Sequence, residues 1–136
     1  MQFKTGKMEN RMKNFISSYE NELIPLYRES ALASWEANIT GTDEDWARNE
    51  KASLAYVNYF TDREAFTGRK ELKESGMVKD PLLARQLDII YHQFPSGQVD
   101  TSLLSEQVRM ETEITKKFNS FRADVGGKML SDNEVE

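Results

Sequence analysis

Apolar residues recur every three or four positions along most of the chain, which is the spacing of one face of an α-helix. The first such segment is the longest, and its apolar positions are Met8, Met12, Phe15, Ile16, Tyr19, Leu23, Leu26, Tyr27, Ala31 and Trp35. Pro25 interrupts the segment and should bend the helix near Asn21 and Glu22, because proline cannot donate a backbone hydrogen bond. Two separate helices would give the same pattern, but we favour one bent helix. The residues before Met8 are expected to form a frayed end.

The stretch from Leu32 to Gly41 closes this first segment. Leu32, Trp35 and Ile39 share one helical face, and we expect Trp35 to be an anchor of the core. Asn38 and Gly41 provide turn chemistry, because asparagine can bond its own backbone and glycine accepts a positive φ. The stretch also contains an N-x-T glycosylation sequon at Asn38. We favour the interpretation that this asparagine and the following threonine bond backbone groups at the helix end.

A second helix is expected over residues 43–60, after a capping-box spacing that begins at Thr42. Its inward positions are Trp46, Ser53, Leu54, Val57 and Phe60. The capping-box spacing that begins at Thr61 opens a third helix, which ends at Ser75-Gly76. Gly68 lies in the middle of that helix and costs about 1 kcal/mol relative to alanine, so we expect this helix to be the weakest.

Two further helices follow. Asp80-Pro81 combines an N-cap side chain with proline at the first helical position, and Pro95-Ser96-Gly97 ends this fourth helix. Its buried stripe is Leu83, Leu87, Ile90, Tyr91 and Phe94. Either Asp100 or Thr101 caps a long fifth helix, and Gly126-Gly127 breaks it. One side of this helix carries Leu104, Val108, Glu111, Ile114, Phe118, Phe121 and, at the end, Val125.

These segments predict an all-α fold, an array of about five helices in which long antiparallel helices are joined by short connections. We find no alternation of apolar and polar residues long enough to predict a strand. The core is expected to bring five side chains into shared contact, namely Trp35, Leu83, Leu87, Ile114 and Phe118.

The sequence predicts that residues 1–136 form a single helical segment. Ser131 and Glu134 have the spacing of a capping box, yet no helix-length segment follows them. We therefore expect this chain to be the truncated N-terminal part of a larger protein.

Composition narrows the function classes. Charged residues make up 30% of the chain and hydrophobic residues 38%, a balance that suits two-faced helices. The net charge of −5 and the lack of a basic cluster argue against nucleic acid as a partner. No run of 18 apolar residues predicts a membrane span, and no apolar segment near the start predicts a signal peptide. The chain has no cysteine, which excludes disulfides and thiolate metal sites.

The residues alone assemble no catalytic, cofactor-binding or metal site. Zinc hydrolases commonly use two histidines and a glutamate in H-E-x-x-H, and His92 is the single histidine of this chain. Asp88 and His92 are spaced as metal ligands on one helix face. We favour instead a histidine that faces the negative helix end beside Tyr91. The serine–histidine–acid arrangement and the glycine-rich phosphate loop are missing as well. We expect no cofactor in this chain.

Three segments carry a family resemblance, and together they cover nearly the whole chain from about Tyr19 onward. They are LIPLYRESALASWEANITG, KDPLLARQLDIIY and TEITKKFNSFRADVGGKMLSDNEV. The matching residues are Ser34-Trp35-x-Ala37-Asn38-Ile39-Thr40, Lys79-Asp80-Pro81-Leu82-Leu83 with Gln86-Leu87, Phe118-Asn119-x-Phe121-Arg122, and Asn133-Glu134. In this order and at these separations they resemble the N-terminal helical region of peptidyl-dipeptidase A, the angiotensin-converting-enzyme family of gluzincin zinc peptidases, and most closely its bacterial members.

The resemblance implies an all-helical peptidase whose N-terminal helices form a lid over a deep cleft. The zinc motif would lie beyond this chain, so zinc is expected in the full-length protein, and none of the family's metal or catalytic residues maps onto a position here. The expected partners are the rest of the peptidase and its peptide substrates, and the family suggests an extracytoplasmic location.

Two functions remain open at this stage. The first is a non-catalytic lid or substrate-access segment of a zinc-dependent peptidyl-dipeptidase-like metallopeptidase. The alternative is a free-standing helical protein–protein interaction module without enzymatic activity. In either case we expect an exposed apolar face, through which the chain could also form a homodimer.

Overall fold

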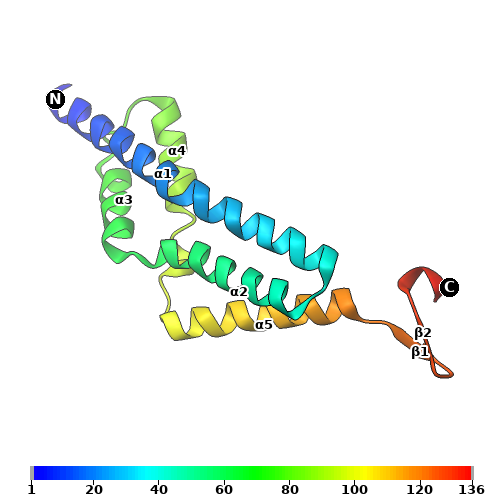
Figure 1. Cartoon of the computed structure of the whole chain (residues 1–136). Coiled ribbons are helices and arrows are strands. Elements are labelled where there is room, and N and C mark those ends of the chain that lie inside the picture. The colour runs from blue at the N-terminus through cyan, green and yellow to red at the C-terminus, as the bar shows by residue number, and fades with distance from the viewer. Residues whose placement is uncertain (1, 136) are drawn as a thin grey trace.

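The computed structural model describes residues 2–135, and its architecture is all-α, as predicted (Figure 1). The helices are α1 (Gln2–Thr40), α2 (Asp43–Asn58), α3 (Arg63–Ser75), α4 (Pro81–Tyr91) and α5 (Thr101–Ser120). Three short 3-10 turns are η1 (Tyr59–Thr61), η2 (Pro95–Gly97) and η3 (Asp132–Glu134). Two short antiparallel strands, β1 (Ala123–Val125) and β2 (Lys128–Leu130), follow α5. Met1 and Glu136 of the predicted 1–136 segment lie outside the described residues.

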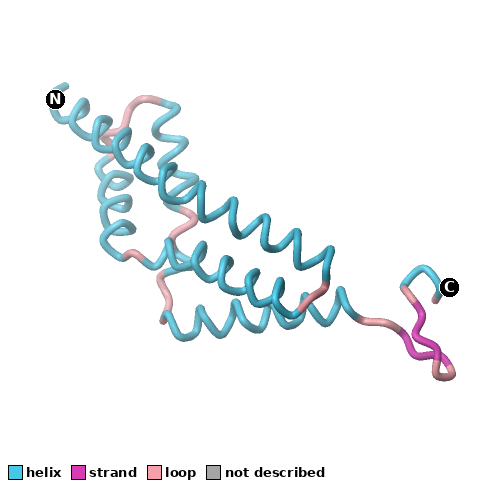
Figure 2. The backbone as a smooth tube through the Cα atoms, viewed as in Figure 1, coloured by secondary structure: helices cyan, strands magenta, loops and turns pink. Residues whose placement is uncertain are grey.

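The helices form two groups along α1 (Figures 1 and 2). α3 and α4 pack together beside the N-terminal half of α1. α2 runs back along the C-terminal half of α1, and α5 packs on α2. Figure 2 shows the strands beyond the end of α5, away from the helical body. The helical body is thus a three-helix layer at one end and a small helical cluster at the other.

α1 is one continuous helix and not two, and it is longer than predicted. It continues through Pro25, so the two-helix alternative is wrong. It also begins at Gln2 and not at Met8, so the expected frayed end is wrong for residues 2–7. The carboxylate of Glu9 helps to explain why the helix includes these first residues. It accepts hydrogen bonds from the backbone N–H groups of Lys79 and Asp80, just before α4, at 3.1 and 3.0 Å. These bonds hold the N-terminal part of α1 on the start of α4.

The main core lies among the N-terminal half of α1, α3, α4 and η1. Its buried members are Met12, Phe15, Leu23, Phe60, Leu72, Leu83, Leu87, Ile90 and Phe94. The ring of Phe94 is fully buried and lies edge-on to that of Phe60, with centroids 5.4 Å apart. Phe66 stacks at 6.4 Å from the same ring. Such ring pairs add stabilisation beyond the area they bury, so Phe94 is the centre of this core.

Three side chains that the sequence placed in the core are exposed. Trp35 is 67% exposed, Ile114 65% and Phe118 82%, so the predicted shared contact with Leu83 and Leu87 is wrong. The physical reason is that α1 and α5 each have two apolar faces. Each helix packs on α2 through the face that does not carry these three residues. α1 packs on α2 with buried alanines at positions 33 and 37, and α5 packs with Leu104, Val108 and Thr112. The buried tryptophan of the chain is Trp46.

Helix starts follow the predicted cap chemistry with one correction. The side chains of Thr42 and Asp80 cap α2 and α4 as predicted, and Asp100 caps α5. The third helix is capped by Asp62 and not by Thr61, because the carboxylate of Asp62 accepts the N–H of Ala65 at 2.8 Å. Thr61 closes η1 instead.

The C-terminal end of α5 also differs from the prediction. The helix stops at Ser120, short of the predicted Gly126-Gly127 break. The two glycines form a two-residue turn with φ of +62° and +85°, values that favour glycine, and Ala123 pairs with Leu130 across the hairpin. The strands were missed because three residues are too few to show an alternating pattern. The predicted capping box of Ser131 and Glu134 is present at η3.

We predict that Gly97→Ala destabilises the chain by about 1–3 kcal/mol, the usual cost of overpacking. A Cβ at this position would lie 2.5 Å from the backbone of Phe60, which cannot move aside easily. Gly68→Ala is the control, because its Cβ would meet only Arg11 Nη2 at 3.5 Å and should stabilise α3 by up to about 1 kcal/mol. Urea unfolding measures both. Equal effects of the two substitutions would contradict this account.

Candidate interaction surface

A row of exposed apolar side chains follows α5 on the side away from α2. We call it the α5 stripe, and its members are Leu103, Met110, Ile114, Phe118 and Phe121, the last being the C-cap residue. Successive members are seven, four, four and three residues apart, so they share one face of the helix. The buried row of the same helix, from Leu104 to Thr112, faces α2. α5 therefore presents one apolar face to α2 and a second to solvent.

A second exposed row follows the C-terminal half of α1. We call it the α1 stripe, and its members are Ile24, Tyr27, Leu32, Trp35 and Ile39. The alanines at positions 33 and 37, which pack on α2, occupy roughly the opposite side of the same helix. α1 thus repeats the arrangement of α5, with one apolar face buried and another open to solvent.

Scattered exposed apolar side chains are ordinary in folded proteins, but rows of them on two helices are not. Each stripe contains aromatic residues, which are common in the buried centre of protein interfaces. The exposed apolar face expected from the sequence is therefore present. It lies on α1 and α5 because the structure uses their other faces for its own packing.

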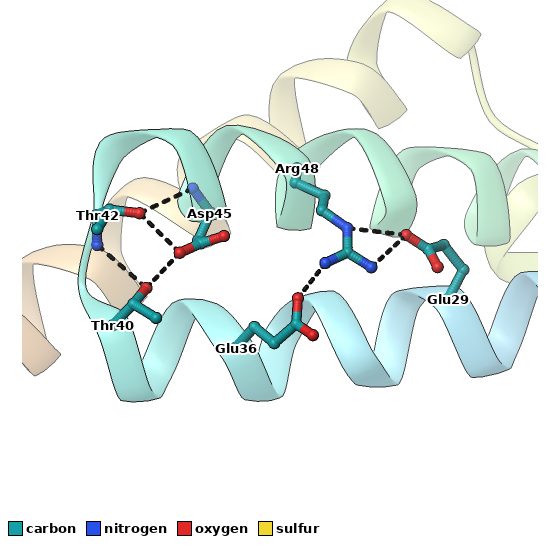
Figure 3. Close-up of polar contacts among 6 residues, drawn as sticks. All are labelled: Glu29, Glu36, Thr40, Thr42, Asp45 and Arg48. Atoms are coloured by element: carbon teal, nitrogen blue, oxygen red, sulfur yellow. Dashed lines mark hydrogen bonds and ion pairs between the residues drawn. The ribbon is translucent and has the colours of Figure 1, made fainter.

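Polar contacts at the α1–α2 connection fix the orientation of the α1 stripe (Figure 3). The guanidinium of Arg48 donates from Nε and Nη2 to Glu29 Oε1, at 3.0 and 2.9 Å, and from Nη1 to Glu36. A single side chain of α2 thereby bridges two carboxylates that lie about two turns apart on the same face of α1. Arginine suits this role because its planar fork holds several acceptors at once.

The turn between the two helices is held by the carboxylate of Asp45. It accepts hydrogen bonds from the hydroxyls of Thr40, at the end of α1, and Thr42, the N-cap of α2, at 2.5 and 2.7 Å. These two hydroxyl bonds hold the pKa of Asp45 below its usual value. Together with the Arg48 bridge, this cluster fixes how α2 lies along α1 (Figure 3).

Polar contacts also tie α5 to the same layer. Lys116 Nζ lies 2.5 Å from Asp43 Oδ1 at the start of α2, and this hydrogen bond lowers the pKa of the carboxyl. Asn119 donates through Nδ2 to the side-chain oxygen of Asn38 on α1. The amide of Asn38 in turn donates to the carbonyl of Ser34 at 2.7 Å, so the sequon asparagine bonds a helix carbonyl, as favoured from the sequence.

The two residues weighed as metal ligands, Asp88 and His92, have other contacts in the structure. The carboxylate of Asp88 accepts a hydrogen bond from Lys73 Nζ at 2.7 Å, which lowers its pKa. His92 is the exposed C-cap of α4, and its ring lies 5.4 Å from that of Tyr91. Across residues 2–135, no group of three or more histidine and acidic side chains is placed to hold a metal ion. The chemistry these side chains can provide is that of ion pairs and helix ends.

No family model matches the chain, and no solved structure matches it. Within the described part of the chain, no helix is long and apolar enough to cross a membrane.

The two tryptophans provide a direct test of this surface. We predict that Trp46→Ala destabilises the chain by about 3–5 kcal/mol, because the ring is 97% buried and its loss leaves a cavity. Trp35→Ala should change stability by less than about 0.5 kcal/mol, because that ring lies mostly in solvent. Urea unfolding with matched baselines measures both. A large loss for Trp35→Ala would mean that the α1 stripe is covered in the isolated chain.

The Asp45 cluster predicts how stability depends on pH. Because the folded pKa of Asp45 is lowered, its stabilisation is present above the unfolded pKa and is lost as the pH falls through the folded value. We expect Asp45→Asn to lower the melting temperature at pH 6, and to show a smaller further fall between pH 6 and pH 2.5 than the original chain. Glu44→Gln, a first-turn neighbour, is the control. Parallel pH curves for Asp45→Asn and the original chain would contradict the assignment.

Proposed function

We propose that this chain is the N-terminal, non-catalytic helical part of a zinc-dependent peptidyl-dipeptidase-like metallopeptidase that hydrolyses peptides, and that it acts as a lid over the substrate-access cleft. The observation that carries the proposal is the pair of exposed apolar stripes on α1 and α5. Stripes of this kind need a further protein surface to cover them. The sequence resemblance names that surface as the rest of the peptidase.

The side-chain chemistry fits a lid better than a catalytic centre. A catalytic zinc ion needs three protein ligands and an open position for water, and His92 is the one imidazole available in this sequence. The metal and its bound water would therefore be supplied by the catalytic part of the full-length protein. A lid contributes by limiting access and by excluding water around chemistry that occurs elsewhere.

A lid must also keep its shape as it moves, and the polar contacts of the α1–α2 pair serve that need. Arg48 and Asp45 hold α2 against α1 at two points, through Glu29 and Thr40 of α1, so the pair would move as one unit with the α1 stripe on its outer side. A change in its orientation would then open or close the cleft without unfolding either helix.

The second candidate is a free-standing helical interaction module, and the geometry of the α5 stripe favours it specifically. Steps of three, four and seven residues are those by which one amphipathic helix packs along another. The occupant would then be a helix of a partner protein, or α5 of a second copy in a homodimer. The two candidates differ in whether the same polypeptide carries a zinc site.

The decisive experiment compares this 136-residue chain with the product of the complete reading frame that contains it. Both are assayed for bound zinc and for cleavage of a fluorogenic peptide with a free C-terminus, with and without chelator. We expect about one zinc and chelator-sensitive release of dipeptides from the full-length protein, and neither from this chain. An inactive, zinc-free full-length protein would overturn the peptidase proposal and leave the interaction module.

A substitution in the α5 stripe tests the role of the surface. In the full-length protein, Ile114→Glu should reduce catalytic efficiency at least about tenfold, because a buried unpaired charge separates the packed surfaces. Ala55→Glu, on the exposed side of α2, is the matched control and should leave activity unchanged. Sedimentation of the isolated chain with the same substitutions reports on self-association. Unchanged activity with loss of a dimer would favour the module over the lid.

A further inference from the structure

A group of adjoining cavities lies between α1 and α3, apart from both stripes. The largest has a volume of about 580 Å³, and two neighbours have about 330 and 310 Å³. All three are lined by Arg11 of α1 and Gly68 of α3, and two of them also by Arg69. Sites for small molecules commonly have volumes of about 300–1,000 Å³, so the space suits a ligand.

In the part of the chain that the structure describes, Arg69 is the cation of the largest cavity that forms no ion pair, whereas Arg11 pairs with Glu71. Its guanidinium carbon lies 3.3 Å from the ring centroid of Phe15, which holds the group against the core. Nη1 donates to the carbonyl of Ala65 at 2.6 Å, while Nε is buried without a partner. Among the described residues, no carboxylate forms an ion pair with Arg69. Burial lowers the pKa of the guanidinium, and the nearby charges of Asp62 and Glu22 act in the opposite direction. The guanidinium also lines the cavity, so its remaining N–H groups can donate to an acceptor that a ligand brings.

The cavity also carries negative charge, which limits the ligands that fit. Glu22, Asp62 and Glu64 line it together with Arg11 and Arg69. Asp62 is occupied as the cap of α3, and Arg11 pairs with Glu71 at 3.2 Å. The carboxylate of Glu22 accepts a hydrogen bond from the hydroxyl of Ser18 at 3.3 Å through Oε1. The groups left for a ligand are therefore the guanidinium of Arg69, the carboxylate of Glu64 and the second oxygen of Glu22. A simple anion would meet repulsion from these carboxylates, whereas a molecule with both charges would meet an opposite charge at each end.

Gly68 keeps this space open at a cost to its helix. A glycine in a helix interior is less stable than alanine, yet a Cβ here would meet nothing closer than Arg11 Nη2 at 3.5 Å. Close packing does not explain the glycine. A longer side chain at this position would project into all three cavities, because the residue lines each of them.

We propose that the cavity between α1 and α3 binds a small zwitterion, a molecule with one carboxylate and one ammonium group such as a free α-amino acid. The carboxylate would pair with the guanidinium of Arg69, and the ammonium with Glu22 and Glu64 across the cavity. Ser18 and Tyr59 also line the cavity, and the hydroxyl of Ser18 donates to Glu22. The proposal is independent of the lid function, because it rests on residues that belong to neither stripe.

The test titrates three probes of similar size into the isotopically labelled chain at constant ionic strength, following the amide spectrum. The probes are L-alanine with both charges, N-acetyl-L-alanine with the carboxylate alone and L-alaninamide with the ammonium alone. We expect saturable shifts confined to residues around Arg11 and Arg69 for L-alanine, with at least about tenfold weaker binding of the other two. Equal binding of N-acetyl-L-alanine would overturn the zwitterion and indicate a general anion site. No saturable shift from L-alanine would overturn the proposal.

Two variants separate binding from folding. Arg69→Gln should weaken L-alanine binding at least about tenfold, and Gly68→Leu should abolish it by filling the space. Gly6→Leu is the matched control, because this glycine is also inside a helix and has open space around it, but lies outside the cavities. Circular dichroism and urea unfolding confirm that each variant folds. If Arg69→Gln fails to fold, Gly68→Leu still decides, and unaltered binding in a folded Gly68→Leu would overturn the proposal.

Discussion

The packing of α2 on the alanine face of α1 determines which apolar surfaces of this protein are buried. Ala33 and Ala37 are fully buried, and small side chains at such a contact let two helix backbones approach closely. Since Trp35 lies on a different side of the same helix, this contact leaves the tryptophan side chain exposed to solvent. The α1 stripe is exposed because α2 packs on the opposite face of α1. The hydrogen bonds of Arg48 to Glu29 and Glu36 stabilise this packing.

The spacing of apolar residues predicted the helices well, because helical periodicity depends only on residues three or four positions apart. The starts at Thr42, Asp80 and Asp100 could be predicted because a cap is a contact between residues two or three positions apart. The choice between two apolar faces of one helix depends on residues far away in the chain. For that reason Ile114 was placed in the core although it is exposed.

The sequence predicted that an exposed apolar face would exist, but not which residues would form it. An exposed apolar face was expected, yet three of its members, Trp35, Ile114 and Phe118, had been assigned to the core. Counting both faces of α5 would have shown the signal, since Leu103 and Leu104 begin two rows on different sides of one helix. The cavity at Arg69 could not have been found this way, because it is formed by α1 and α3 residues about 50 positions apart.

Stability is distributed unevenly along this fold. The α3–α4 end buries a ring-rich core, whereas every described residue of the strands 123–125 and 128–130 is exposed or only half-buried. A two-stranded hairpin without a covered face has little stability of its own in water. Opening this hairpin would leave the core around Phe94 intact, so the segment after Ser120 can exchange one set of contacts for another while the helices stay folded. In energetic terms, a surface that bound this segment would mainly have to offset the entropy lost in ordering a few residues.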